Sequence, residues 1–194
     1  MKKFLILLIL LSSYPAANAQ FIYHDLTASY GFATSYQIMD VIEDVLVATF
    51  SFGTYEKEDY NYSGALFVSY KYAPSYRINT GVALGIDRVS GDLIQNDVKY
   101  GDFTESHTTL ALEADYRWVK QEVIQLYTML GLGVTLNTEK GSYNSTGDTD
   151  TETSSNVAFQ VTPIGMRIGR KLGGFAELGF GYKGIMNFGL SYRF

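Results

Sequence analysis

The chain has 194 residues and a formal charge of −5, with 19 glycines, 16 tyrosines, three prolines and no cysteine. The absence of cysteine excludes a disulfide framework and a cysteine-linked lipid anchor. The acidic balance argues against nucleic-acid binding, because phosphates require a basic surface.

The N-terminal residues indicate a secretory signal. Two lysines precede the purely apolar run of residues 4–11, and the small residues Ala-Asn-Ala follow at 17–19. The apolar run is too short to span a bilayer as a helix. We therefore expect residues 1–19 to be a signal peptide cleaved after Ala19, and residues 20–194 to form one domain.

The remaining sequence consists of segments of alternating polarity separated by turn residues. Residues 76–87 show this best: Tyr76, Ile78 and Val82 share one parity, whereas the other parity is small, polar or charged. This period of two is the signature of a two-faced strand. A change of parity at Pro163 indicates a β-bulge, since proline cannot donate to the strand ladder. The eight predicted strands are 27–35, 63–72, 76–87, 108–118, 124–137, 157–169, 175–183 and 186–194.

The connections alternate between short and long, as in membrane barrels with short periplasmic turns and long outside loops. The long polar connections are 36–62, 89–106 and 138–155, and together with Asp87 they hold most of the acidic residues. Apolar residues between Ile38 and Leu46 recur at helical spacing. We therefore expect an amphipathic helix in the first connection in place of a ninth strand.

Aromatic residues with outward parity gather at the end opposite the long connections. Such a ring is typical of the interfacial girdle of a membrane barrel, and a soluble sandwich has no need of it. The predicted fold is an all-β, eight-stranded antiparallel transmembrane up-and-down β-barrel with a short amphipathic helix in the first outside loop. The predicted girdle comprises Tyr70, Tyr72, Tyr76, Tyr116 and Trp118, with Tyr192 and Phe194 of the last strand.

With its signal peptide, its eight alternating strands and its last residues NFGLSYRF, the chain resembles the small eight-stranded outer-membrane barrels of Gram-negative bacteria, the OmpA/OmpX-like barrel domain family. In that family, a terminal polar-x-Gly-x-x-aromatic-x-aromatic pattern is the recognition signal for the outer-membrane assembly machinery. Asn187, Gly189, Tyr192 and Phe194 match that pattern. The resemblance implies an outer-membrane location but leaves the function open, because family members range from adhesion factors to enzymes.

An eight-stranded barrel has an interior that side chains can fill. Inward glycines leave room for large inward charges, and buried charges need partners. We expect an ion-pair network that closes the lumen, with Arg167 opposite Glu177 if the intervening turn centres on Leu172; a gated ion path is the alternative. The predicted network comprises Glu113, Asp115, Glu177, Arg77, Arg117, Arg167 and Arg193.

Two further motifs suggest chemistry weakly. Ser106 and His107 lie beside Glu105 near the outer rim, where lipid-modifying barrel enzymes keep a serine, a histidine and an acid. Adjacent strand residues point to opposite faces, however, so no enzyme is predicted. Alternate acids at 148–152 could hold calcium, but the surrounding composition is typical of a solvated loop. No metal or cofactor is therefore predicted.

The sequence thus favours a monomeric barrel with a structural or surface-interaction role, a closed lumen and acidic outside loops. Its expected partners are outer-membrane lipid, lipopolysaccharide and the assembly machinery, and nucleic acid is not among them. A narrow conduit for small molecules, including apolar ones, gated by the loop helix is the alternative function, and a lipid-modifying enzyme is a more distant one.

Overall fold

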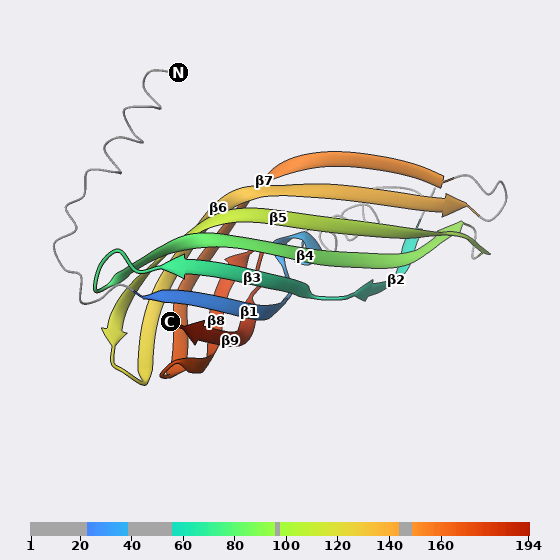
Figure 1. Cartoon of the computed structure of the whole chain (residues 1–194). Helices are drawn as coiled ribbons and strands as arrows, with labels where there is room; N and C mark the ends of the chain where they lie inside the picture. Colours follow the sequence, from blue (N-terminus) through green and yellow to red (C-terminus); the bar gives the residue numbers. More distant parts are fainter. Residues whose placement is uncertain (1–22, 39–55, 96–97, 144–148) are drawn as a thin grey trace, which may run out of the picture.

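The computed structural model describes residues 23–38, 56–95, 98–143 and 149–194. The expected signal peptide and its cleavage site lie outside these residues. The described part of the chain is built almost entirely of strands (Figure 1). These strands are β1 (His24–Phe32), β2 (Glu56–Tyr62), β3 (Ala65–Tyr72), β4 (Ile78–Gln95), β5 (Val98–Lys120), β6 (Ile124–Tyr143), β7 (Thr149–Gly169), β8 (Leu172–Gly181) and β9 (Met186–Arg193).

Eight of these strands form a closed antiparallel barrel in the order β1-β3-β4-β5-β6-β7-β8-β9. The last strand returns to the first, with pairing from Asp25↔Arg193 to Phe32↔Met186. All other neighbours in the ring are consecutive along the chain, apart from β2, which is not part of the barrel. The predicted eight-stranded up-and-down barrel is therefore confirmed.

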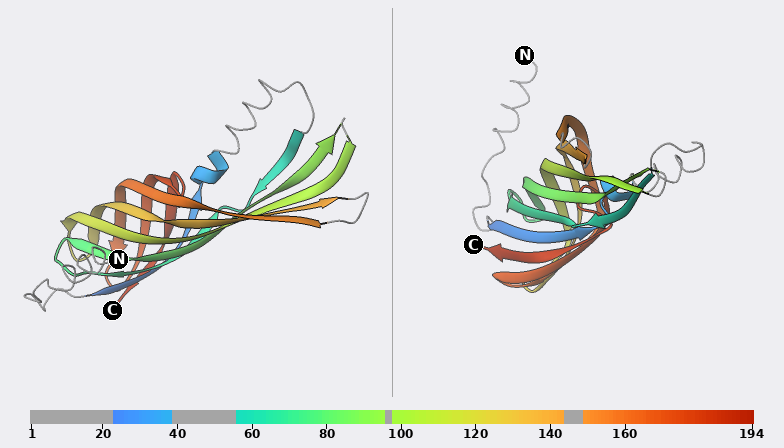
Figure 2. Two further views of the ribbon diagram at one scale, coloured as in Figure 1. Left: turned by 90° about the horizontal axis from the view of Figure 1, so that it is seen from above. Right: turned by 90° about the vertical axis from the view of Figure 1, so that its right-hand side faces the viewer.

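Strands β4 to β7 continue well beyond the barrel. The β4–β5 ladder runs to Gln95↔Val98, and the β6–β7 ladder runs to Ser142↔Thr149. Strand β2 pairs with the far part of β4 and adds a fifth strand. We call this extension the protruding sheet; it comprises β2 and residues 89–95, 98–106, 138–143 and 149–156. Figure 2 shows it extending away from the barrel on one side.

The protruding sheet corrects the expectation of long loops at 89–106 and 138–155. These segments form two strand hairpins, β4–β5 and β6–β7, and residues 96–97 and 144–148 between their strands lie outside the described residues. Polar residues occupy both parities of these hairpins, so the period of two is not visible there. The first connection also contains β2, which the sequence did not reveal.

A short helical turn follows β1 at residues 35–38. Thr34 caps it, because the Gln37 amide donates to the Thr34 hydroxyl at 3.3 Å and the Ile38 amide donates to the Thr34 carbonyl at 3.0 Å. The rest of the predicted amphipathic helix lies outside the described residues. No helix in the described ranges is long and apolar enough to cross a membrane.

The two faces of the barrel wall alternate as predicted. Outward Leu112, Leu132 and Leu190 are between 62% and 69% exposed, whereas inward Glu113 is 3% exposed. The β-branched and aromatic residues that dominate the strands suit this pleated surface. The β7–β8 register shifts between Val161 and Ile164, which confirms the predicted bulge at Pro163.

Candidate functional site

Glu113 lies at the centre of a buried cluster in the barrel interior. Its carboxylate is 3.1 Å from Lys71 Nζ and 2.5 Å from Lys183 Nζ. The Tyr182 hydroxyl donates a hydrogen bond to the same carboxylate at 2.9 Å. All four side chains are buried. We call these residues the Glu113 cluster, and they join β3, β5 and the β8–β9 turn.

The β8–β9 turn reaches this cluster because it folds into the barrel. Tyr182 and Lys183 are 1% and 2% exposed, although they connect two strands at the end of the barrel that carries the protruding sheet. Gly184 has φ of +90°, a conformation that disfavours other residues. A side-chain carbon at Gly131 would collide with the Tyr182 hydroxyl, so this glycine provides the space that the ring occupies. The side chains of this turn therefore occupy part of the barrel interior.

A second set of ion pairs continues from the Glu113 cluster toward the other end of the barrel. Asp115 lies 3.2 Å from Lys71 Nζ and 3.0 Å from Arg117 Nε. Asp25 lies 3.0 Å from Arg193 Nε and 3.8 Å from Arg117 Nη2. The charges alternate in sign along this path, so each buried ion has a partner of opposite charge.

The structure groups the predicted network residues differently from the expectation. Glu113, Asp115, Arg117 and Arg193 belong to the connected ion pairs just described. Lys71, Lys183 and Asp25 also belong to them, although the sequence analysis did not select these three. Lys71 could have been found, because its parity in β3 is opposite to that of the outward residues Tyr70 and Tyr72.

Glu177 and Arg167 are both buried but do not pair with each other. Glu177 accepts hydrogen bonds from the Tyr127 hydroxyl and the Asn187 amide, both at 2.7 Å. Arg167 donates to Ser191 Oγ at 2.5 Å and to carbonyl oxygens of the β7–β8 turn.

The expected opposition of these two residues is wrong because the turn centres on Lys171. That register pairs Gly169 with Gly173, and it places Phe175 opposite Arg167. The predicted centre at Leu172 was therefore displaced by one residue, which shifts the pairing by two.

Arg77 is a second correction, because it does not enter the interior. It precedes β4 at the rim, is exposed, and donates to the Tyr116 hydroxyl at 3.1 Å. A cavity of about 20 Å³ lies among the inward charges, lined by Asp25, Lys71, Arg117, Glu177 and Lys183 among others. A cavity of this size accommodates about one water molecule.

A separate polar group lies at the mouth of the barrel, beneath the protruding sheet. Asp87 accepts hydrogen bonds from the Thr34 hydroxyl at 2.7 Å and from the Gln37 side-chain amide at 3.2 Å. Tyr36 stacks on His107 with ring centroids 4.6 Å apart. We call these five residues the mouth cluster. Burial raises the pKa of the Asp87 carboxyl above its ordinary value.

The mouth cluster accounts for the histidine that the sequence analysis considered for catalysis. His107 is buried in the mouth, and its Nδ1 lies 2.9 Å from Asn137 Oδ1. Ser106 is its neighbour in β5 and pairs in register with Arg88, so the two side chains point to opposite faces. The structure does not bring Ser106 and His107 together as a catalytic pair.

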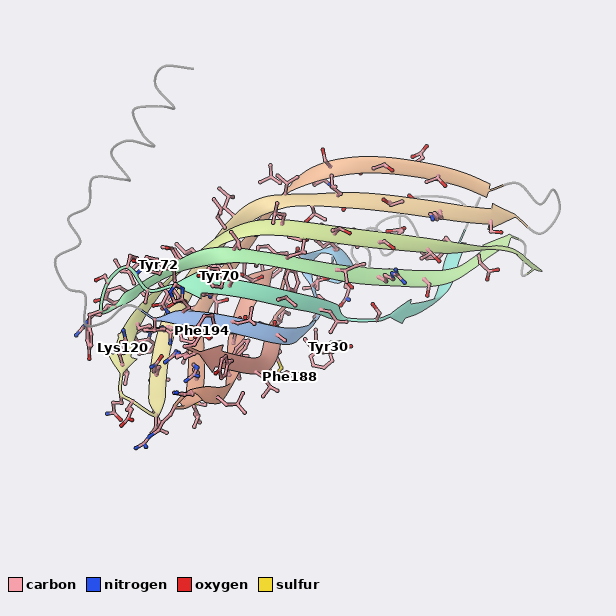
Figure 3. All side chains as sticks on the ribbon, in the orientation of Figure 1. Tyr30, Tyr70, Tyr72, Lys120, Phe188 and Phe194 are labelled. Atoms are coloured by element: carbon pink, nitrogen blue, oxygen red, sulfur yellow. The ribbon has the colours of Figure 1, made fainter. Side chains whose placement is uncertain are left out.

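The residues predicted for the girdle lie at the end of the barrel where the described chain begins and ends. Tyr70, Tyr76, Tyr116 and Trp118 are 41–49% exposed on the outer surface. His24 stacks between Tyr70 and Phe194, with centroid distances of 5.8 and 5.5 Å, and Tyr72 lies 5.7 Å from the same ring. Figure 3 shows Tyr70, Tyr72 and Phe194 together, with Tyr30 and Phe188 farther toward the mouth.

The residues of the terminal pattern occupy both faces of β9. Asn187 faces the interior and is 2% exposed, while Tyr192 and Phe194 face outward at 48% and 60%. Gly189 packs so closely against β1 that a side-chain carbon there would collide with the Ala28 carbonyl oxygen. Recognition of this pattern by the assembly machinery remains a prediction.

No protein-family model matches the chain, and no curated protein matches it. Among solved structures, the attachment invasion locus protein Ail of Yersinia pestis, in complex with the heparin analogue sucrose octasulfate, has a TM-score of 0.48 at 12% identity. That comparison covers 89% of this chain and 97% of the Ail chain. The N-terminal β-barrel domain of Pseudomonas aeruginosa OprF has a TM-score of 0.46 at 15% identity and covers 90% and 98%.

Proposed function

We propose that this protein is an outer-membrane β-barrel with a structural and surface-interaction role, in which the barrel anchors the protruding sheet outside the cell. The closed strand pairing satisfies the backbone hydrogen bonds without a free edge, as a membrane barrel requires. Three features of the molecule support this proposal: the barrel wall, the barrel interior and the protruding sheet.

The barrel wall supports a membrane location. Its outward residues form a continuous apolar surface across all eight strands, far larger than the patches that soluble monomers expose. Outward apolar residues, inward charges and aromatic residues at one boundary match the membrane-barrel pattern. In β5 this apolar surface extends from Leu110 to Trp118, and in β4 from Ile78 to Ile86.

The interior supports a closed lumen. The Glu113 cluster joins the inward turn to two barrel strands, and a cavity among the inward charges has a volume of only about 20 Å³. This arrangement favours an anchor over a conduit. A catalytic role has no comparable support, since the Ser106 and His107 side chains point to opposite faces of β5.

The observation that carries the surface-interaction role is the outer edge of β7. Residues 152–157 pair with β6 on one side, while the pairing of β7 with β8 begins only at Gln160. The side chains of these residues are exposed. An exposed strand edge can add an extended segment of another protein through backbone hydrogen bonds. The proposed partner is therefore a protein that contributes one strand.

Paired proline and alanine substitutions test this role. Along β7, successive backbone N–H groups point alternately toward β6 and toward the free edge. We therefore compare Thr153→Pro and Ser154→Pro with Thr153→Ala and Ser154→Ala in bacteria that display the chain, and measure their adhesion to cultured mammalian cells and to each other. At the position whose N–H faces the free edge, proline should abolish adhesion while alanine preserves it. Adhesion that survives both proline substitutions would contradict the proposed role.

A further inference from the structure

Aromatic rings hold a lysine at the rim of the barrel where β5 ends. Lys120 Nζ lies 4.7 Å from the ring centroid of Tyr23 and 4.7 Å from that of Tyr76. The same ammonium group donates to the Tyr76 carbonyl oxygen at 2.5 Å. Contacts of this kind attract a cation to the faces of both rings. Lys120 is labelled in Figure 3 at the Phe194 end of the barrel.

Two arginines extend this basic group along the rim. The Arg193 guanidinium lies 4.8 Å from the centroid of the same Tyr23 ring. The Arg77 guanidinium lies 6.0 Å from the Tyr116 ring and also donates to its hydroxyl. We call Arg77, Lys120 and Arg193 the rim cluster.

The positive charge of the rim cluster is only partly compensated. Arg193 shares Asp25 with Arg117, whereas Lys120 and Arg77 form no ion pair with any residue that the structure describes. Partial burial, together with the positive charges of Arg117 and Arg193, lowers the pKa of Lys120 to about 8. An anion placed at this rim would therefore be attracted by the excess positive charge.

The location of the rim cluster indicates which anion it meets. Tyr116 and Trp118 are outward residues at the boundary of the apolar surface. The β5–β6 register shifts between Arg117 and Val119, so Lys120 pairs with the inward Gln125 at the edge of the barrel opening, and its ammonium group reaches the outward Tyr76 ring. Aromatic and basic residues at this level of a membrane protein lie among lipid headgroups. A phospholipid with its acyl chains against the apolar wall would thus present its phosphate to the rim.

We propose that the rim cluster is a binding site for the headgroup phosphate of an anionic phospholipid in the periplasmic leaflet. This inference rests on the proposed membrane location and sidedness. The two aromatic rings and the Tyr76 carbonyl orient the Lys120 ammonium in advance. Arg77 contributes charge from the exposed side, and Arg193, which is ion-paired with Asp25, adds charge from the lumen side. The site selects lipids by headgroup charge, so phosphatidylglycerol is preferred to phosphatidylcholine.

The single tryptophan of the chain provides a local probe of this site. Trp118 is outward and two residues from Lys120, and no other tryptophan contributes fluorescence. The chain is folded into phosphatidylcholine vesicles that contain brominated phosphatidylglycerol or brominated phosphatidylcholine, and quenching of Trp118 reports the relative binding of each lipid. We expect several-fold selectivity for phosphatidylglycerol. Lys120→Gln and Arg77→Gln should each reduce it by up to about fivefold, because a basic residue near an anionic surface contributes about that factor.

A matched control separates a local site from general charge attraction. Lys140 is exposed in the protruding sheet, so Lys140→Gln makes the same charge change at the other end and should leave the selectivity unchanged. Equal quenching by brominated phosphatidylcholine in all variants shows that Trp118 keeps its depth. Equal binding of the two lipids, or selectivity that survives Lys120→Gln, overturns the proposed site. Absence of quenching by either lipid overturns the membrane location itself.

Discussion

Lys183 and Glu113 form an ion pair of 2.5 Å inside the barrel, although Lys183 belongs to a turn between two strands at the end that carries the protruding sheet. The pair holds the β8–β9 turn within the lumen, and the Tyr182 hydroxyl bonds to the same carboxylate. Because both partners are buried, neither charge is exposed to bulk water. The turn and the barrel wall therefore depend on each other for stability.

Replacing the central carboxylate should destabilise the barrel strongly. Glu113→Gln leaves Lys183 buried without its ion-pair partner, while Lys71 keeps Asp115. Breaking a buried pair in this way costs roughly 3–5 kcal/mol. The free energy of unfolding in urea, followed by Trp118 fluorescence in lipid vesicles, measures the loss.

The matched control is an exposed ion pair at the rim. Glu122 and Arg170 lie 3.1 Å apart, with side chains 72% and 71% exposed. Glu122→Gln should change stability by at most about 1 kcal/mol, because water screens such a pair. Equal losses in the two variants would contradict the assigned role of the Glu113 cluster.

The inward β8–β9 turn also predicts the conductance of the barrel. The unmodified chain should form no large steady pore in a planar bilayer, since buried ion pairs cross the interior and the cavity among them is about 20 Å³. The double variant Tyr182→Ala, Lys183→Ala empties the upper lumen and should raise the frequency of ion-conducting events. Ile185→Ala, on the exposed side of the same connection, should have no such effect. A large steady pore in the unmodified chain would refute the closed lumen.

Much of the fold could be predicted because the barrel wall separates two very different surroundings. Outward apolar residues such as Leu110 and Leu112 alternate with inward Ala111 and Glu113, and this contrast produces a clear period of two. The difference in polarity between the two faces is lost in the protruding sheet, where Glu105 and Thr138 lie in strand segments that are largely polar. The sequence therefore predicted loops where backbone pairing continues the strands.

The candidate interior site could be predicted only in part, because strand parity gives direction but not depth or register. Parity placed Glu113 and Asp115 inward, which the structure also shows. The opposition of Arg167 to Glu177 depended on the turn centre, and a one-residue error changed both partners. Tyr182 and Lys183 fold inward where Gly184 adopts a left-handed conformation. The sequence predicts a tight turn at this point but does not predict the direction in which the turn folds.

The mouth cluster should become more stable on acidification. Burial gives the Asp87 carboxyl a higher pKa in the folded than in the unfolded chain, so the folded state binds more protons between the two values. Ionised Asp87 therefore costs stability near neutral pH, and this cost decreases as pH falls through the folded pKa. Hydrogen exchange at the Gln37 and Ile38 amides, corrected for the intrinsic effect of pH, should show increasing protection.

Asp87→Asn should keep the bond from Thr34 and remove this pH dependence. His107 and Tyr36 are the titratable groups beside Asp87, so the same measurement in a His107→Gln background isolates the carboxyl. An unchanged pH dependence in Asp87→Asn would assign it to another group.

The last residue should matter for assembly more than for the strength of the barrel seam. Phe194 stacks on His24 at 5.5 Å, and the two residues exchange backbone hydrogen bonds of 2.9 and 3.1 Å. Deletion of Phe194 should lower the amount of chain inserted in the outer membrane, if the terminal aromatic is the signal that the resemblance implies. His24→Ala removes the same stacking but keeps the terminal aromatic, and it should insert normally with slightly reduced stability. Heat-modifiable mobility of membrane fractions in gels measures the inserted amount. Equal insertion defects in both variants would show that the seam contact, and not recognition of the terminus, explains the effect.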